Sequence, residues 1–255
     1  MSPGPDADTF GLVHSVSSDT QLIQINPTKQ RWKKLRCATI TGARLIQEQL
    51  SRGGQRTYPV MITLTYSPRV SWNSRHVSDF LKICREWFRR RGRRFYYCWV
   101  AELMKNGMVH FHVIVWMPKG LRLPKPDKRG WWPHGLTRIE AARNAVGYIA
   151  KYCSKEHQPN SFPKGLRTHG RGGLDERSKI EARWWSAPKW VRSWCSNITD
   201  VRRVTGGGFV CVDTGEWRPS PWRTVFSDGK IFTVTLICQS DSEPRSVSPA
   251  AGSGA

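Results

Sequence analysis

The chain has 255 residues, of which 38% are hydrophobic, enough for a folded core. Its 41 Lys and Arg against 19 Asp and Glu give a net charge of +22, which predicts a polyanionic partner. No apolar run approaches the roughly 18 residues of a membrane span, and residues 1–10 lack a signal-peptide pattern. With no basic amphipathic helix evident either, nucleic acid is favoured over a membrane. Seven cysteines without a Cys-x-x-Cys pair disfavour a zinc ribbon, and their odd number fits a reducing cytoplasm.

The first third of the chain predicts a helix, a strand and a second helix. Residues 1–27 are polar with Pro and Gly, so we expect them to be disordered. Residues 28–51 have helical periodicity, and their basic first half either meets phosphate or forms a solvated face. Residues 58–66 predict a buried strand. Residues 73–91 predict a helix capped by Ser74 and ending in a run of arginines.

Two further strands are expected to form a hairpin. Residues 95–102 and 109–116 are apolar and rich in aromatic or β-branched side chains. The step Asn106-Gly107 between them is typical of a tight turn. We therefore expect these two strands to pair in antiparallel fashion.

The second strand of this hairpin contains His110-Phe111-His112. Because side chains alternate along a strand, the two imidazoles project from one face. Glu102 precedes His110 by eight residues and should lie opposite it in the hairpin. One carboxylate and two imidazoles then converge, a ligand set suited to Mg²⁺ or Mn²⁺. The alternative is a pair of half-exposed histidines beside an ordinary carboxylate at the strand end.

Two basic segments flank the hairpin, and both are candidates for binding DNA. One is the turn of arginines after the helix over residues 73–91, and the other is a loop over residues 118–135 that mixes Lys, Arg and Trp. Basic and aromatic side chains together suit unpaired bases and their phosphates, although the loop could instead pack on the surface and most tryptophans could fill the core. The candidate residues are Arg89, Arg90, Arg91, Arg93, Arg94, Lys125, Lys128, Arg129, Trp131 and Trp132.

A third helix is expected over residues 137–155. Tyr148 and Tyr152 are four residues apart, so they share one helical face, and each precedes a lysine by three residues, Lys151 and Lys155. The alternative is that both tyrosines are core residues of an amphipathic helix.

The last hundred residues predict irregular structure followed by short strands. Residues 158–183 are rich in Gly and Arg and predict a loop, and a Trp- and Arg-rich segment interrupted by Pro188 follows. From about residue 201 the pattern changes to short strands, including a hairpin that turns at Asp228-Gly229. The residues after 239 are mostly Ser, Pro, Gly and Ala and predict a disordered tail.

Three elements in a fixed order resemble the HUH endonucleases that initiate rolling-circle DNA replication in bacteriophages and plasmids. They are the strand with Thr63-Leu64-Thr65-Tyr66, the His110-Phe111-His112 motif, and the doubled Tyr-x-x-Lys that starts at Tyr148 and Tyr152. The resemblance covers about residues 58–155. It implies an α+β fold, with a central antiparallel sheet flanked by helices and a metal site on the sheet beneath the tyrosine helix.

The resemblance also implies a reaction. Glu102, His110 and His112 match the family's metal ligands, and Mg²⁺ or Mn²⁺ would polarise the scissile phosphodiester. Tyr148 or Tyr152 would attack it, leaving a 5′-phosphotyrosyl link and a free 3′-hydroxyl, with support from Lys151 and Lys155. The partners would be an origin, as single-stranded or supercoiled duplex DNA, and a host polymerase. No Walker-type loop is present, so unwinding would need a host helicase.

Two rival functions stay open. One is a transposase or relaxase with the same chemistry, although relaxases usually carry three histidines. The other is a non-catalytic protein that binds single-stranded nucleic acid through its basic and aromatic surface. We expect the chain to consist of a disordered segment (1–27), a basic helical lead-in (28–57), an endonuclease core (58–160), a Trp- and Arg-rich segment (161–200), a small β extension (201–239) and a disordered tail (240–255).

Overall fold

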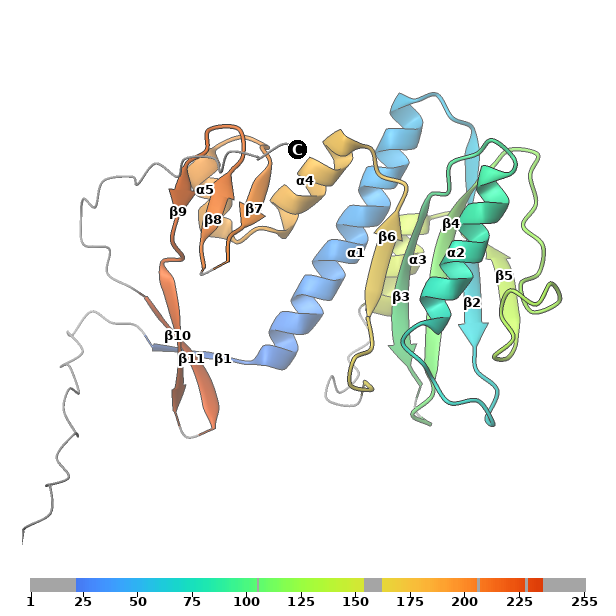
Figure 1. The fold of residues 1–255 in the computed structure, drawn as a ribbon, viewed down its shortest axis with the longest axis horizontal. Helices are drawn as coiled ribbons and strands as arrows, with labels where there is room; N and C mark the ends of the chain where they lie inside the picture. Colours follow the sequence, from blue (N-terminus) through green and yellow to red (C-terminus); the bar gives the residue numbers. More distant parts are fainter. Residues whose placement is uncertain (1–21, 105, 154–161, 206, 228, 236–255) are drawn as a thin grey trace, which may run out of the picture.

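The computed structural model describes residues 22–104, 106–153, 162–205, 207–227 and 229–235 (Figure 1). The predicted disorder of residues 1–21 and of the tail after residue 239 lies outside these residues. The prediction for the end of the N-terminal segment is wrong, because β1 (Leu22–Ile25) is a strand that pairs with β11 (Lys230–Thr235). A partner distant in the sequence supplies its backbone hydrogen bonds, which local composition does not reveal.

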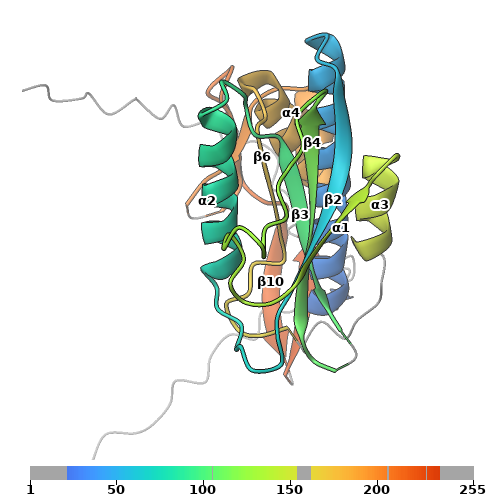
Figure 2. The same cartoon turned by 90° about the vertical axis from the view of Figure 1, so that its right-hand side faces the viewer.

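A five-stranded sheet forms the centre of the molecule, and every neighbouring pair of its strands is antiparallel. Helices cover both of its faces, as Figure 2 shows, so the predicted α+β class is confirmed. In spatial order the strands are β5 (Thr137–Ala141), β2 (Thr57–Thr65), β4 (Val109–Pro118), β3 (Tyr97–Leu103) and β6 (His169–Gly172).

The alternation of side chains along the strands divides the core into two layers. One face of the sheet packs on α2 (His76–Arg89), with Phe111, Trp99 and Trp132 among its buried aromatic residues. The opposite face packs on α1 (Pro27–Arg52) and α3 (Ala145–Cys153) (Figure 2). Glu102, His110 and His112 occur at the alternate positions, so they belong to the face covered by α1 and α3.

The helix α1 extends the prediction by one residue at each end. Asn26 caps it, because its side chain accepts a hydrogen bond from the Lys29 backbone N–H at 3.0 Å, and Pro27 occupies the first turn. Ser74 does not cap α2. The residue before that helix is Arg75, which makes no capping hydrogen bond through its side chain.

The helix predicted over residues 137–155 is wrong in its first half. Residues 137–141 form the edge strand β5, which pairs with β2 in the register Ile62 opposite Ile139. The free edge of β2 offers backbone partners that outweigh a helical periodicity carried mainly by alanines. Asn144 then begins α3, since its side-chain oxygen accepts from the Gly147 N–H at 2.8 Å.

The loop predicted over residues 158–183 is also wrong where the structure describes it. Residues 169–172 form β6, and α4 (Glu176–Ser186) follows. A Cβ at Gly170 would clash with the Trp99 ring, and one at Gly172 would clash with Tyr97. These glycines therefore let an edge strand pass close to two aromatic rings, which is a recognised use of glycine in strands.

The C-terminal region is rich in short strands, as predicted. After α5 (Lys189–Cys195) comes a small sheet of β7 (Val201–Arg203), β8 (Phe209–Cys211) and β9 (Trp217–Arg218). The predicted hairpin is formed by β10 (Trp222–Ser227) and β11, and Gly229 at its turn has φ 69°. None of the helices in the described ranges has the length and apolar character needed to cross a bilayer.

We expect replacement of Leu45 in α1 by Ala to lower the free energy of unfolding by about 2–5 kcal/mol. Leu45 is fully buried against the sheet, so truncation removes apolar contacts and leaves a cavity. Leu136→Ala is the matched control, because that side chain is 72% exposed and should change stability by less than about 0.5 kcal/mol. Urea unfolding of both variants measures the difference, and equal effects would contradict the packing described.

Candidate active site

The register of the central hairpin brings the predicted ligands onto one face. Glu102 of β3 lies directly opposite His110 of β4, which confirms the placement expected from the sequence. On the other side of β4, Thr65 lies opposite His110 and Thr63 lies opposite His112. The turn between the strands contains Gly107, whose φ of 80° suits glycine.

The closest contact at this site joins Glu102 to His112. The two side chains are each about 4–5% exposed, and His112 Nε2 lies 2.5 Å from Glu102 Oε2. His112 Nδ1 lies 3.3 Å from the hydroxyl oxygen of Thr63. Both ring nitrogens therefore have polar neighbours, which fixes the ring orientation and offsets the cost of burying a carboxylate.

The helix α3 places a tyrosine directly on this pair. The rings of Tyr152 and His112 are stacked, with centroids 3.6 Å apart and planes 16° from parallel. Tyr152 is half-buried, whereas Tyr148, one turn earlier, is 36% exposed and Lys151 is exposed. Lys155 lies outside the residues that the structure describes. Both tyrosines therefore belong to the helix above the predicted site, with Tyr152 in contact with it.

The donor set fits a hard divalent ion in its chemistry. In the described ranges no group of three or more His, Cys, Asp or Glu side chains is arranged to hold a metal ion. Glu102 and His112 nevertheless already bring an oxygen and a nitrogen donor together, and half-buried His110 follows on the same face of β4. Carboxylate and imidazole donors suit Mg²⁺ or Mn²⁺ with open positions. The metal site stays a prediction.

The predicted DNA-binding residues lie elsewhere. The basic turn follows α2, and the basic loop packs beside α2, so both belong to the face of the sheet opposite Glu102 and His112. Most of their charged side chains are exposed and available to phosphate. These exposed residues are Arg89, Arg90, Arg91, Arg93, Arg94, Lys125, Lys128 and Arg129.

One of the predicted DNA contacts is wrong. Trp132 is only 1% exposed, and its indole N–H donates to the Thr65 carbonyl oxygen at 3.0 Å. Its ring packs edge-on against Tyr66, so no base can stack on it. Trp131, the neighbouring residue, is half-buried and stays available.

A cluster of titratable side chains that the sequence did not suggest surrounds the end of β2. The Tyr66 hydroxyl lies 3.1 Å from His76 Nδ1, and the rings of His76 and His134 are stacked with centroids 3.5 Å apart. Burial lowers the pKa of both histidines and raises the pKa of Tyr66. No sequence signal could have found this cluster, because its members come from three separate segments.

Together these features define an α+β protein whose antiparallel sheet carries a buried His–Glu pair beneath a helix with two tyrosines. Residues 59–157, from β2 to just beyond α3, match a family model of replication-associated proteins of the ORF2 type. No curated protein and no solved structure gave a match to the chain. The family match supports a replication-associated protein with DNA as its partner, and it coincides with the segment that contains the site.

Proposed function

We propose that this protein nicks and rejoins one DNA strand at a rolling-circle replication origin, through a 5′-phosphotyrosyl intermediate. The observation that carries the proposal is the contact between Tyr152, His112 and Glu102. It brings a potential nucleophile, an oriented imidazole and a buried carboxylate together within the segment that matches the replication-associated family. The three-element resemblance to HUH initiators is the second support.

In the proposed reaction the tyrosine oxygen attacks the scissile phosphorus. A Tyr Oη–P bond forms and the P–O3′ bond breaks, so the 5′ phosphate remains on the tyrosine and the 3′ oxygen leaves with a proton as a free hydroxyl. The tyrosine proton is lost to solvent. Because a free tyrosine has a pKa of about 10, it needs nearby positive charge to ionise, and Lys151 on the same helix is placed to supply it. Attack of a 3′-hydroxyl on the phosphotyrosine reverses the step and rejoins the strand.

The residues that would hold a metal ion are Glu102, His110 and His112. Bound Mg²⁺ or Mn²⁺ would supply Lewis-acid polarisation of the phosphodiester. The chain's own contribution is orientation, since Thr63 and Glu102 hold His112 from its two ring nitrogens.

Two tyrosines suit a cycle with two strand transfers. Tyr152 stacks on His112, while Tyr148 is more exposed and one helical turn, about 6 Å, away along the axis. One tyrosine can hold a 5′ end while the other cuts the regenerated origin. The free 3′-hydroxyl would serve a host polymerase, with a host helicase unwinding the duplex.

The decisive experiment is a nicking assay on supercoiled plasmids that carry a rolling-circle origin. We expect open circles with protein bound at the 5′ end, in the presence of Mg²⁺ or Mn²⁺ and not with chelator. A protein that only binds nucleic acid would leave every plasmid supercoiled, and that outcome would refute the proposal. Terminal repeats beside the gene, together with their cleavage by the protein, would instead point to transposition.

Binding to DNA should weaken steeply as salt rises, because the net charge of +22 predicts many lysine and arginine contacts to phosphate. With about six such contacts, affinity for duplex DNA falls about a thousandfold between 50 and 200 mM salt. Fluorescence anisotropy with a labelled duplex measures the log–log slope. Arg93→Gln, which removes one exposed charge of the basic turn, should reduce the slope by about 1. A slope near zero for the unmodified protein would show that its charge serves something other than DNA.

A further inference from the structure

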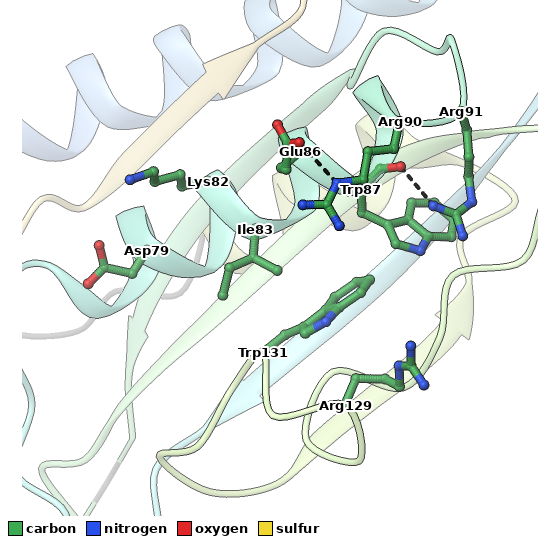
Figure 3. A pocket seen from close by; sticks show the side chains of 9 residues that line it. All are labelled: Asp79, Lys82, Ile83, Glu86, Trp87, Arg90, Arg91, Arg129 and Trp131. Atoms are coloured by element: carbon green, nitrogen blue, oxygen red, sulfur yellow. Dashed lines mark hydrogen bonds and ion pairs between the residues drawn. The ribbon is translucent and has the colours of Figure 1, made fainter.

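A cavity of about 630 Å³ lies beside α2, on the face of the sheet opposite Glu102 and His112 (Figure 3). One wall is the second half of α2, and the other is the loop that connects β4 to β5. The two walls join the predicted basic turn to the predicted basic loop, which are far apart in sequence. A volume of this size lies within the range of ligand sites, roughly 300–1,000 Å³.

The inner surface of the cavity is aromatic and apolar. Trp87 and Trp131 meet edge to face, with centroids 5.9 Å apart and planes at 62°. Ile83, which is 38% exposed, lies between them and the solvent-facing side of α2 (Figure 3). The Arg91 guanidinium lies 4.0 Å from the centroid of the Trp87 ring and donates to the Trp87 carbonyl oxygen at 3.0 Å. Arg91 thus fixes Trp87, while the Trp131 ring contributes a flat surface to the cavity.

The rim of the cavity is mostly cationic. Arg90 is paired with Glu86, which also binds Arg89, and these arginines hold the pKa of the Glu86 carboxyl at about 2. The charge of Glu86 is therefore already matched. Lys82 and Arg129, by contrast, make no ion pair with any residue that the structure describes, and both are exposed.

We infer that this cavity binds an unpaired nucleotide of single-stranded DNA, with the base on Trp131 and Ile83 and the flanking phosphates on Arg129 and Lys82. The inference rests on the proposed function for its ligand, DNA, and adds a second strand-binding site. Indole rings stack on any base, and uncommitted cations on the rim complement the phosphates. Duplex DNA does not fit this chemistry, because its bases are already stacked. A strand held here lies across the sheet from the tyrosines, away from the point of cleavage.

The sequence analysis included Arg90, Arg91, Arg129 and Trp131 among DNA contacts, but it placed Trp87 only in the core of a helix. A spacing of four between Trp87 and Arg91 is the signal that could have identified a surface cation–π pair. The pairing of Trp87 with Trp131 had no sequence signal.

The test is anisotropy binding of the full chain to a labelled twenty-nucleotide oligo(dT), which carries no origin, in chelator so that no cleavage occurs. We expect Trp131→Ala to weaken binding about tenfold, the usual effect of losing one base–aromatic stack. Trp131→Phe retains a ring and should lose less. Arg129→Gln, at an exposed position that folding does not need, should weaken binding and lower the salt slope by about 1.

Trp185→Ala is the matched control. Trp185 is 38% exposed and has two arginine neighbours, Arg44 and Arg192, at 5.9 and 5.5 Å, but it lies outside the cavity. Its replacement should leave oligo(dT) affinity within about twofold of the unmodified protein. An oligo(dT) carrying one 5-iodouracil should also crosslink on irradiation to the peptide that contains Trp131 or Trp87.

The outcomes separate this inference from the proposed function. If Trp131→Ala and Arg129→Gln bind oligo(dT) like the unmodified protein, the cavity is not a nucleotide site, whatever the nicking assay shows. Equal losses for Trp131→Ala and Trp185→Ala, or equal losses on duplex and single strand, would also overturn it. Failure of the unmodified protein to bind any DNA would refute both.

Discussion

The protein with both Tyr148 and Tyr152 replaced by Phe should form no covalent adduct with DNA, and its nicking rate should fall at least about a thousandfold, as expected on losing a nucleophile. Phe keeps the ring, so the packing of Tyr152 on His112 survives while the attacking oxygen is lost. A labelled origin oligonucleotide, followed by mass spectrometry of the linked peptide, measures both effects.

The single variants decide how the tyrosines share the reaction. If they alternate, Tyr148→Phe and Tyr152→Phe should each retain one adduct, on the remaining tyrosine, and lose repeated transfer. Loss of all adduct in only one of them would replace the alternating scheme with a one-tyrosine mechanism. Tyr58→Phe is the control, since its hydroxyl donates to the Leu121 carbonyl oxygen far from α3 and its loss should leave the adduct intact. An adduct in the double variant would exclude both tyrosines as nucleophiles.

Replacing Glu102 by Gln should lower nicking at least about a hundredfold, the scale expected when a ligand or its direct partner is lost. Gln has the same shape but no charge, so it can neither hold a divalent ion as a carboxylate does nor stabilise His112 electrostatically. DNA affinity should change little, because exposed basic residues on other parts of the surface supply it. His112→Ala should behave in the same way.

Thr63→Val tests the orienting contact separately. It removes the hydroxyl near His112 Nδ1 and keeps the strand-forming shape, so we expect a smaller loss of nicking, about tenfold. Binding of Mn²⁺, followed by its paramagnetic resonance signal, gives a readout independent of activity and should weaken in Glu102→Gln. Full nicking by Glu102→Gln, with unchanged thermal stability, would remove this carboxylate from the site.

The local pattern of the hairpin predicted most of the site. Alternating side chains and the Asn106-Gly107 turn were sufficient to place Glu102 opposite His110 on one face of the sheet. The nearest partner of Glu102 is nevertheless His112, one diagonal step along β4. Register fixes which Cα atoms face each other, but long side chains also reach diagonal neighbours, and rotamers chosen by the surrounding core decide between them.

By itself the sequence determined the class of fold, the hairpin with its histidines, and a helix with two tyrosines, because periodicity and turn residues act over a few residues. Only the tertiary structure decided that residues 137–141 pair with β2, that the glycines of β6 fit against Trp99 and Tyr97, and that Trp132 is buried while Trp131 is not. Each of these depends on a partner distant in the chain. Edge-strand hydrogen bonds, close backbone approach and the burial of one of two adjacent rings are settled by the packed neighbours, and local sequence does not identify those neighbours.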